Sequence, residues 1–421
     1  MKILIVLLKN TAPLDFIIPV LNELNHDENT EINILFCDLS KFTFLRKSEF
    51  YSDFFREKKI NDFDYLSFSS IKCKLIINYL RKLYSRSHYD SESTSKVKLR
   101  IERLIYNQII TTINFRNIID VIGPNVILLG NTDSKNKLGI NEIIHSIHDK
   151  RIRTILLPHA PHHRTTTIIT PFYKEKNWIL PEFCEYWMPF IHDQTWKNIP
   201  NKKRNFKYIG YPGLDHSWLT LLKENNKIVN NNQQLKILFI IRRFDSKNNQ
   251  NDNTKDFIYS YSEFINVCNL VNKSLKNLAD DYKIIVKPHP SNDYSELNKI
   301  IFEQGFNEWE LTYEPIYSFI GNTDLIISMY STIHLVPAIA GIPVILLSSS
   351  IQEIAESDDK IKELYHGMQF YLKDNNKLGD TLRGIININR VSPPSPDIKH
   401  IRNFFPDLAI TRSINRILGK Q

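Results

Sequence analysis

The chain has 421 residues, which corresponds to two or three domains and excludes a single small binding module. Hydrophobic residues make up 42% and charged residues 24%, enough apolar surface for sizeable cores, so a mainly disordered chain is excluded. The 54 Lys and Arg residues exceed the 46 Asp and Glu residues by eight. This mild excess fits a polyanionic ligand, an anionic membrane surface or nucleic acid, and does not choose among them.

The first half of the chain alternates short apolar runs with helical patterns. A helix is expected at residues 14–24, after the first run. Strands are expected at residues 3–8, 31–37, 125–129, 153–157, 186–190 and 208–210. This alternation is typical of a parallel sheet that helices cover on both faces.

Two stretches lie between the second and third of these strands. Asp62 and Asp64 have the spacing of a metal-chelating pair, but they sit in a charged loop away from any clear strand end, so we interpret them as solvated. Residues 72–116 carry ten basic and three acidic side chains, with apolar residues at helical spacing. We favour an ordinary solvated helical pair on the N-terminal domain, because apolar residues at helical spacing more often mark the face of a helix that packs in a core. The alternative is a basic helical insertion, at about 70–116, that docks on anionic lipid or a lipid-linked acceptor.

Two candidates for a general base follow strands of the first half. His159 comes after the strand at 153–157, and a histidine at a cleft edge can take a proton from an acceptor hydroxyl. Asp133, after the strand at 125–129, is the rival base, or it caps the following helix. His162 and His163 are interpreted as exposed to solvent, and the cluster lacks the HExxH spacing of a zinc site, so no metal is expected.

The alternation stops in an Asn-rich stretch and then restarts. We therefore expect an acceptor-side domain over residues 1–224, a linker over 225–234 and a nucleotide-donor-binding domain with a tail over 235–421. Strands of the second domain are expected at residues 235–241, 282–286, 324–328 and 343–347. The predicted fold class is α/β, with two Rossmann-like domains that face a cleft and a C-terminal helix that packs back on the N-terminal domain.

Polar residues follow three strands of the second domain, where ligands bind in open parallel sheets. Lys287 and His289 lie in the Lys-Pro-His-Pro turn and could supply charge to a phosphate. Ser331 and Thr332 open a helix whose free N–H groups could bind the same phosphate. Taken singly, the first motif is a stiff turn and Ser331 is a helix cap; their occurrence in one domain favours a site.

The basic pair Arg242-Arg243 follows the strand at 235–241 and could approach a diphosphate, with one of the two facing inward. A solvated loop pair is the equal alternative.

The chain has no GxGxxG, GxxxxGK[ST] or GxSxG motif, so NAD enzymes, P-loop ATPases and hydrolases with a nucleophile elbow lose support. The four cysteines form no CxxC pair, which favours a reducing compartment. No stretch reaches the roughly 20 apolar residues of a bilayer span. We expect a cytoplasmic protein, with attachment to the inner face of the cytoplasmic membrane left open.

The motifs of the second domain resemble those of the GT-B glycosyltransferases that build bacterial surface polysaccharides. The Lys-Pro-His-Pro turn, followed about 40 residues later by Asp-Leu-Ile-Ile-Ser-Met-Tyr-Ser-Thr, is similar to CDP-glycerol glycerophosphotransferases and to the sialyl and Kdo transferases that use CMP-sugars. The resemblance implies that His289 and Ser331/Thr332 contact donor phosphates. We assign the donor site to Lys287, Pro290, Ser331, Thr332, Arg242, Tyr330 and Glu314.

Two stretches of the first half resemble the same enzymes. Residues 210–215, Gly-Tyr-Pro-Gly-Leu-Asp, are similar to the Gly-x-Pro-x-x-Asp stretch that ends many GT-B N-terminal domains. His159 occupies a place like that of the glycerophosphotransferase histidine that is implied to be the base, although Ala160 stands where those enzymes have Gly. Asn131 to Asp133 is a loose counterpart of the acidic motif of the sialyltransferases.

The predicted function is a metal-independent, inverting transfer of a sugar, from a CMP-activated 2-keto sugar, to a hydroxyl of a bacterial surface glycan. His159 or Asp133 would deprotonate the acceptor, while His289 and the donor-site residues take up charge on the leaving phosphate. The expected partners are a nucleotide-activated sugar and a glycan or lipid-linked glycan acceptor, with no cofactor and no nucleic acid. The alternatives are a CDP-polyol phosphotransferase of teichoic-acid-like polymer synthesis and, third, an enzyme like the UDP-GlcNAc 2-epimerases, whose Gly-Asp-Thr segment residues 130–133 resemble.

Overall fold

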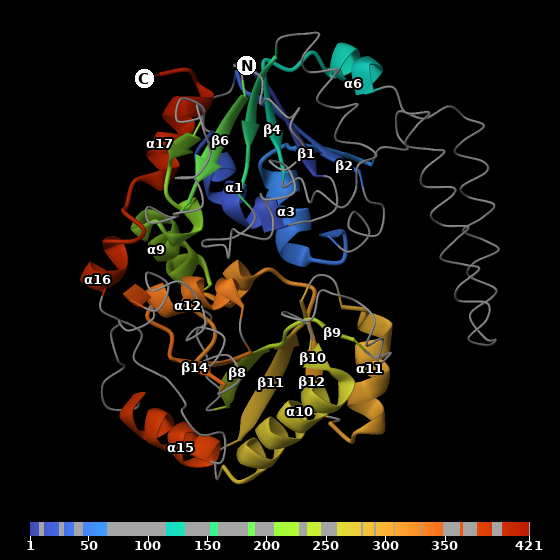
Figure 1. Ribbon diagram of the computed structural model, residues 1–421, viewed down its shortest axis with the longest axis vertical. Helices are drawn as coiled ribbons and strands as arrows, with labels where there is room; N and C mark the ends of the chain where they lie inside the picture. Colours follow the sequence, from blue (N-terminus) through green and yellow to red (C-terminus); the bar gives the residue numbers. More distant parts are fainter. Residues whose placement is uncertain are drawn as a thin grey trace, which may run out of the picture.

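The structure is a computed structural model with two parallel sheets (Figure 1). It describes residues 1–7, 12–24, 29–37, 45–64, 115–130, 152–158, 184–189, 206–226, 234–245, 259–278, 281–289, 292–306, 308–329, 331–347, 363–364, 377–389 and 398–420. The expected helical insertion at about 70–116 therefore lies almost wholly outside the described residues, as does most of the expected linker. Among the helices of these ranges, none has the length and apolar character needed to cross a bilayer.

The first sheet has seven parallel strands in the order β3-β2-β1-β4-β5-β6-β7. Its strands are β1 (Lys2–Leu7), β2 (Glu31–Phe36), β3 (Asn61–Asp64), β4 (Val126–Leu129), β5 (Arg153–Leu156), β6 (Cys184–Met188) and β7 (Phe206–Tyr208). The chain runs outward from β1 to β3, then returns to the other side of β1 at β4. That reversal is the topological switch point at which open α/β sheets bind ligands. Six of the strands correspond to predicted ones.

The interpretation of residues 62–64 as a solvated loop is wrong. They belong to β3, which pairs with β2 so that Ile34 lies opposite Asp62. The side chain of Asp62 is 13% exposed and its Oδ2 lies 2.7 Å from the guanidinium of Arg46. An edge strand has only one neighbour and can carry polar residues, so its apolar pattern was too weak to recognise.

Four helices of the described residues belong to the first domain. They are α1 (Ala12–Leu24), α3 (Glu49–Glu57), α6 (Phe115–Ile122) and α9 (His216–Asn225), which follows the short turn η3 (Pro212–Leu214). Most of α1 is apolar because it is buried between the sheet and the C-terminal helix α17 (Ala409–Ile417). Ser48 caps the start of α3, because its hydroxyl accepts a hydrogen bond from the Tyr51 N–H at 3.3 Å.

The second sheet has five parallel strands in the order β12-β11-β8-β13-β14, the same winding pattern as the first. Its strands are β8 (Leu235–Ile240), β11 (Tyr282–Lys287), β12 (Trp309–Leu311), β13 (Leu325–Ser328) and β14 (Val344–Leu346). A separate ribbon pairs β9 (Phe244–Asp245) with β10 (Tyr259–Ser260). The remaining elements are α10 (Tyr261–Lys276), α11 (Tyr294–Glu303), η4 (Ile316–Phe319), η5 (Thr332–His334), α12 (Leu335–Ile339), α15 (Leu378–Asn389) and α16 (Ile398–Arg402).

The two sheets share one hydrophobic core. Alternate residues of β8 point to opposite faces, so Leu238 and Ile240 join a cluster that also contains the buried residues of α1 and β1. Ile237 and Phe239 join a second cluster on the far face, beneath α10 and α15. The segment around Tyr317 enters the first cluster from the C-terminal side. The relative position of the two sheets is therefore stabilised by apolar burial as well as by polar contacts.

The C-terminal helix packs back on the N-terminal domain, against α1 and η3, as predicted (Figure 1). Asp215, at the end of the Gly-x-Pro-x-x-Asp stretch, accepts hydrogen bonds from the Ala409 N–H at 3.1 Å and the Ile410 N–H at 2.7 Å. These are among the first N–H groups of α17, which have no partner within the helix. The side chain of Arg412 also donates to the Ile209 carbonyl at 2.8 Å. The motif thus anchors the end of the chain to the first domain.

Candidate active site between the two sheets

The central strands of the second sheet end at one level. Lys287 of β11 and Ser328 of β13 both pair with Ile240 of β8, so the segments that follow these strands leave the same edge. The Ile241 N–H donates to the Lys287 carbonyl at 3.1 Å, and the Met329 N–H donates to the Ile240 carbonyl at 2.9 Å. This register brings the Lys-Pro-His-Pro turn and the segment at Ser331 together, although they are far apart in the sequence.

A cavity of about 50 Å³ lies at this edge, between the two sheets. Lys287, His289 and Ser331 line it from the C-terminal side. Asp15 of α1 and Tyr51 of α3 line it from the N-terminal side. The cavity is therefore formed by both domains, and a ligand in it would contact groups from each.

Lys287 and Asp15 are charged groups of opposite sign in a poorly solvated place. Lys287 is 8% exposed and its Nζ donates a hydrogen bond to the Glu314 carbonyl at 2.6 Å. Burial lowers the pKa of Lys287, although the carboxylates of Asp15 and Glu314 act in the opposite direction. Burial likewise raises the pKa of Asp15, which the ammonium of Lys287 and the hydroxyl of Tyr51 partly offset. Opposite charges in such a site interact more strongly than they would in water.

The carboxylate of Glu314 bridges the two domains. Its Oε1 accepts from the Glu49 N–H at 2.8 Å, and its Oε2 accepts from the Phe50 N–H at 3.1 Å and the Ser48 hydroxyl at 2.8 Å. These donors form the N-terminal end of α3, where the helix dipole favours a negative charge. The carboxylate of Glu314, which was predicted to bind the donor, thus binds the N-terminal end of α3 in the other domain. Its contact with a donor stays a prediction.

Solved structures that resemble the chain share this two-domain arrangement. A UDP-GlcNAc 2-epimerase from Neisseria meningitidis, solved with UDP-GlcNAc bound, superposes with a TM-score of 0.52 at 14% identity, over 100% of both chains. A second UDP-N-acetylglucosamine 2-epimerase gives 0.52 at 11% identity, over 100% of this chain and 96% of that one. The wall teichoic acid polymerase TagF gives 0.51 at 12% identity, over 100% of this chain and 88% of that one.

The chain has a GT-B-like fold. This confirms the predicted class of two facing Rossmann-like domains. At these identities the likeness concerns the fold alone. A scan against models of protein families finds no match for the chain, and a search of curated proteins finds none that is significant.

Of the two arginines that follow β8, only one is buried, as expected. Arg242 is 7% exposed, whereas Arg243 is exposed to solvent. Asn292 donates a hydrogen bond to the Arg242 carbonyl at 3.1 Å and so joins the segment after β8 to the one after β11. Arg242 does not line the cavity itself. Its proposed contact with a donor phosphate is untested.

The helix expected at Ser331 is shorter than its sequence pattern indicates. Thr332 begins the three-residue turn η5, which leads into α12 of five residues. A short helix sums few peptide dipoles, so its end offers less electrostatic stabilisation to an anion than a long helix would. The Ser331 side chain makes no capping hydrogen bond and lines the cavity instead. The hydroxyl, rather than the helix end, is the feature that this segment contributes.

Four predicted site residues lie outside the described part of the chain: His159, Asp133, Pro290 and Tyr330. Asp15 and Tyr51, by contrast, were missed. One signal for Asp15 was present, since it is the single charged residue in the apolar run from Pro13 to Leu21, just after the first strand. No group of three His, Cys, Asp or Glu side chains that could hold a metal ion occurs among the residues that the structure describes.

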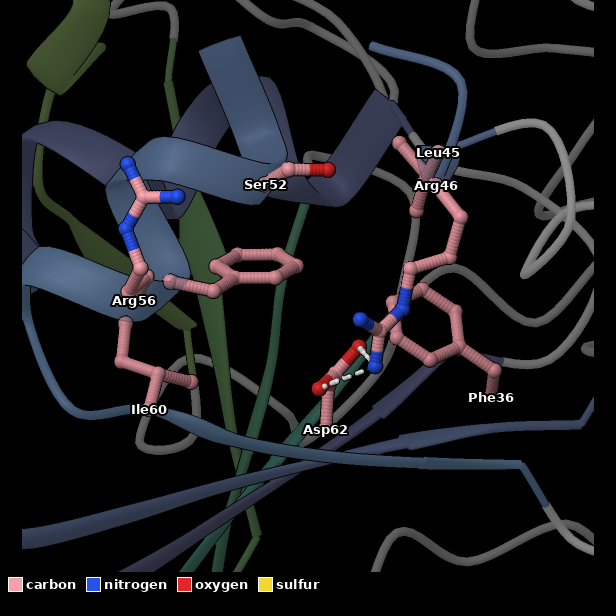
Figure 2. Close-up of a pocket in the computed structure, with 8 residues that line it drawn as sticks. Phe36, Leu45, Arg46, Ser52, Arg56, Ile60 and Asp62 are labelled. Carbon is pink, nitrogen blue, oxygen red and sulfur yellow. Dashed lines mark hydrogen bonds and ion pairs between the residues drawn. The ribbon is translucent and has the colours of Figure 1, made fainter. Parts of the chain in front are cut away.

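A second cavity, of about 140 Å³, lies on the N-terminal domain (Figure 2). Figure 2 shows the Arg46–Asp62 ion pair and Phe36 on one side, and Arg56 and Ile60 on the other. Burial raises the pKa of Asp62, and the guanidinium of Arg46 offsets part of that rise. Two residues along the chain from Arg46, Ser48 contacts Glu314, so the wall of this cavity is directly connected to the contact between the domains.

Proposed function

We propose that the chain is a nucleotide-sugar-dependent glycosyltransferase that moves a sugar from a CMP-activated 2-keto sugar to a hydroxyl of a surface glycan. One observation carries the proposal: Lys287 and His289, at the end of β11, and Ser331, after β13, line one cavity with Asp15 and Tyr51 of the opposite domain. A donor phosphate on the C-terminal side would face an acceptor on the N-terminal side. Transfer between two bound substrates requires that geometry.

The C-terminal side of the cavity suits a leaving phosphate. In direct displacement the acceptor oxygen attacks the anomeric carbon, and the electron pair of the breaking C–O bond passes to the nucleotide phosphate. Positive charge and donors that are already in place stabilise that oxygen without reorganisation. Lys287 supplies an ammonium, His289 a ring N–H and Ser331 a hydroxyl. Attack on the face opposite the phosphate predicts inversion of configuration. The sequence alone predicts His159 or Asp133 as the base, and both lie outside the described residues.

Two other enzyme classes share the fold and supply the alternatives. TagF is described as a wall teichoic acid polymerase in a structure with CDPG, which supports polyol phosphate transfer from a CDP-linked donor as the second candidate. The Neisseria enzyme is a UDP-GlcNAc 2-epimerase, and epimerisation is the third candidate. The three differ in the nucleotide that the C-terminal domain would bind and in the bond that breaks.

Calorimetric titration of the chain with CMP, CDP, UDP and GDP tests the proposal. Preferential binding of CMP is the expected result, followed by release of CMP from a CMP-sugar and inversion at the transferred carbon. Preference for CDP, with new phosphorus in the product, would favour polyol phosphate transfer. Preference for UDP would contradict the CMP assignment and favour epimerisation or hexose transfer.

A further inference from the structure

Asp15 is a carboxylate at the wall of the interdomain cavity that the proposed mechanism has not yet used. It lies in the first turn of α1 between the fully buried side chains of Leu14 and Phe16. Its Oδ1 accepts a hydrogen bond from the Tyr51 hydroxyl at 2.7 Å. Its main-chain carbonyl accepts one from the Tyr317 hydroxyl. Within the described part of the chain, no hydrogen bond reaches Oδ2. The side chain is thus oriented through Oδ1, and the residue lines the cavity.

The surroundings of Asp15 are costly for a carboxylate that has only a structural role. An ionised carboxyl group loses hydration on burial, and a similar apolar residue would avoid that cost. The titratable groups that face it are Tyr51 from α3, Tyr211 beside η3, Tyr317 from η4 and, across the cavity, Lys287 and His289. Two of these, Tyr51 and Lys287, favour the ionised form, and burial opposes it more strongly. A raised pKa makes a carboxylate a stronger proton acceptor than an ordinary one, which favours a role in proton removal.

We propose that Asp15, in place of His159 or Asp133, is the general base that removes the proton of the acceptor hydroxyl. The inference rests on the proposed function and adds to it a catalytic residue on the acceptor side. The acceptor O–H bond breaks and its proton passes to Oδ2, while the acceptor oxygen bonds to the anomeric carbon. The bond from that carbon to the phosphate oxygen breaks, and the phosphate keeps the electron pair. The proton leaves Asp15 for solvent after the product departs.

Tyr51 and Lys287 have positioning roles in this step. The Tyr51 hydroxyl holds Oδ1 in place, and Asp15 itself lines the cavity. Lys287 lines the same cavity and its ammonium favours the ionised form of Asp15, so it would act on the carboxylate before the reaction and on the phosphate during it. Asp15 and the phosphate contacts would therefore act on opposite sides of the reacting carbon, which in-line displacement requires.

The test compares Asp15→Asn with Glu23→Gln, a matched control in which an exposed carboxylate of the same helix becomes an amide. Nucleotide release is measured from CMP-N-acetylneuraminate, CDP-glycerol and UDP-GlcNAc with water as the acceptor, and nucleotide affinity is measured by calorimetry. Asp15→Asn should lower the rate roughly 10²- to 10⁴-fold, the usual contribution of a general base, with the nucleotide dissociation constant changed less than about threefold. Glu23→Gln should retain the wild-type rate.

The pH dependence of kcat/KM in Tyr51→Phe provides a second test, because a merely structural role of Asp15 would leave that dependence unchanged. The hydrogen bond from Tyr51 lowers the pKa of Asp15, so its removal raises that pKa. The rising limb of kcat/KM against pH should therefore shift to higher pH. An unshifted limb contradicts the inference, even if Asp15→Asn does not fold.

The failures of the two proposals can be told apart. If the wild-type chain releases no nucleotide from any of the three donors, the proposed function is wrong and this inference falls with it. If the wild-type chain is active and Asp15→Asn retains its rate, only the assignment of the base is wrong. A loss of nucleotide affinity as large as the loss of rate would make Asp15 a donor-binding group and would also overturn the assignment.

Discussion

Replacing Glu314 should loosen the contact between the two domains. Its carboxylate accepts hydrogen bonds from the Glu49 and Phe50 N–H groups and from the Ser48 hydroxyl, all on the opposite domain. Glu314→Ala removes all three. Because Glu49 is exposed, water can reach part of this helix end once the carboxylate is gone. The loss of folding stability should therefore lie at the lower end of the range that is usual for hydrogen bonds to a charged group.

The size of the effect follows from the two main-chain bonds. A hydrogen bond to a charged group contributes about 1.5 to 3 kcal/mol, so the lower value for two bonds gives a loss of about 3 kcal/mol. The entropy of unfolding is roughly 2.1 cal/mol/K per residue, or about 0.9 kcal/mol/K for 421 residues. If the chain unfolds as one unit, the melting temperature should fall by about 3 °C.

Thermal unfolding followed by calorimetry measures this change. Glu303→Gln is the control: Glu303 pairs with Lys299 on the surface of α11 at 3.6 Å, and such pairs contribute only about 0.3 to 0.5 kcal/mol. Combining Glu314→Ala with Ser48→Ala should give less than the sum of the single losses, because the two side chains bond directly. A melting temperature for Glu314→Ala equal to that of the control would refute the reasoning.

Three further predictions concern other contacts. His289→Ala should lower nucleotide release by about a hundredfold or more, and an unchanged rate at saturating donor would exclude its role at the phosphate. Gly213→Ala should destabilise the chain by about 1 to 3 kcal/mol in denaturant unfolding, because a Cβ there would lie 2.8 Å from the ring of Tyr211. Burial raises the pKa of Asp215 in the folded chain, so its contribution to stability is fully present below the unfolded pKa and declines as pH rises through the folded one. Stability curves of Asp215→Asn should be flatter than wild type over that range, and parallel curves would contradict this.

The strand pattern was readable because buried parallel strands are continuous apolar runs. The sequences of β1, β8 and β13 contain almost only apolar residues, and each of these strands was predicted within a residue or two. The turn residues at the ends of β11 and β13 were also recognisable, since polar side chains just after buried strands stand out. The edge strand β3 was missed because half of its sequence, Asn-Asp-Phe-Asp, is acidic.

The composition of the cavity could not be read in the same way. Asp15 and Lys287 are 272 positions apart, and only the packing of one domain against the other brings them to one cavity. The sequence around Glu314 likewise did not indicate that its carboxylate would bind the end of a helix in the other domain. Local sequence sets which segments become strands and helices, because hydrophobic periodicity is a property of neighbouring residues. Which side chains meet across the domains depends on sheet order, register and the shared core, and those are properties of the whole folded chain.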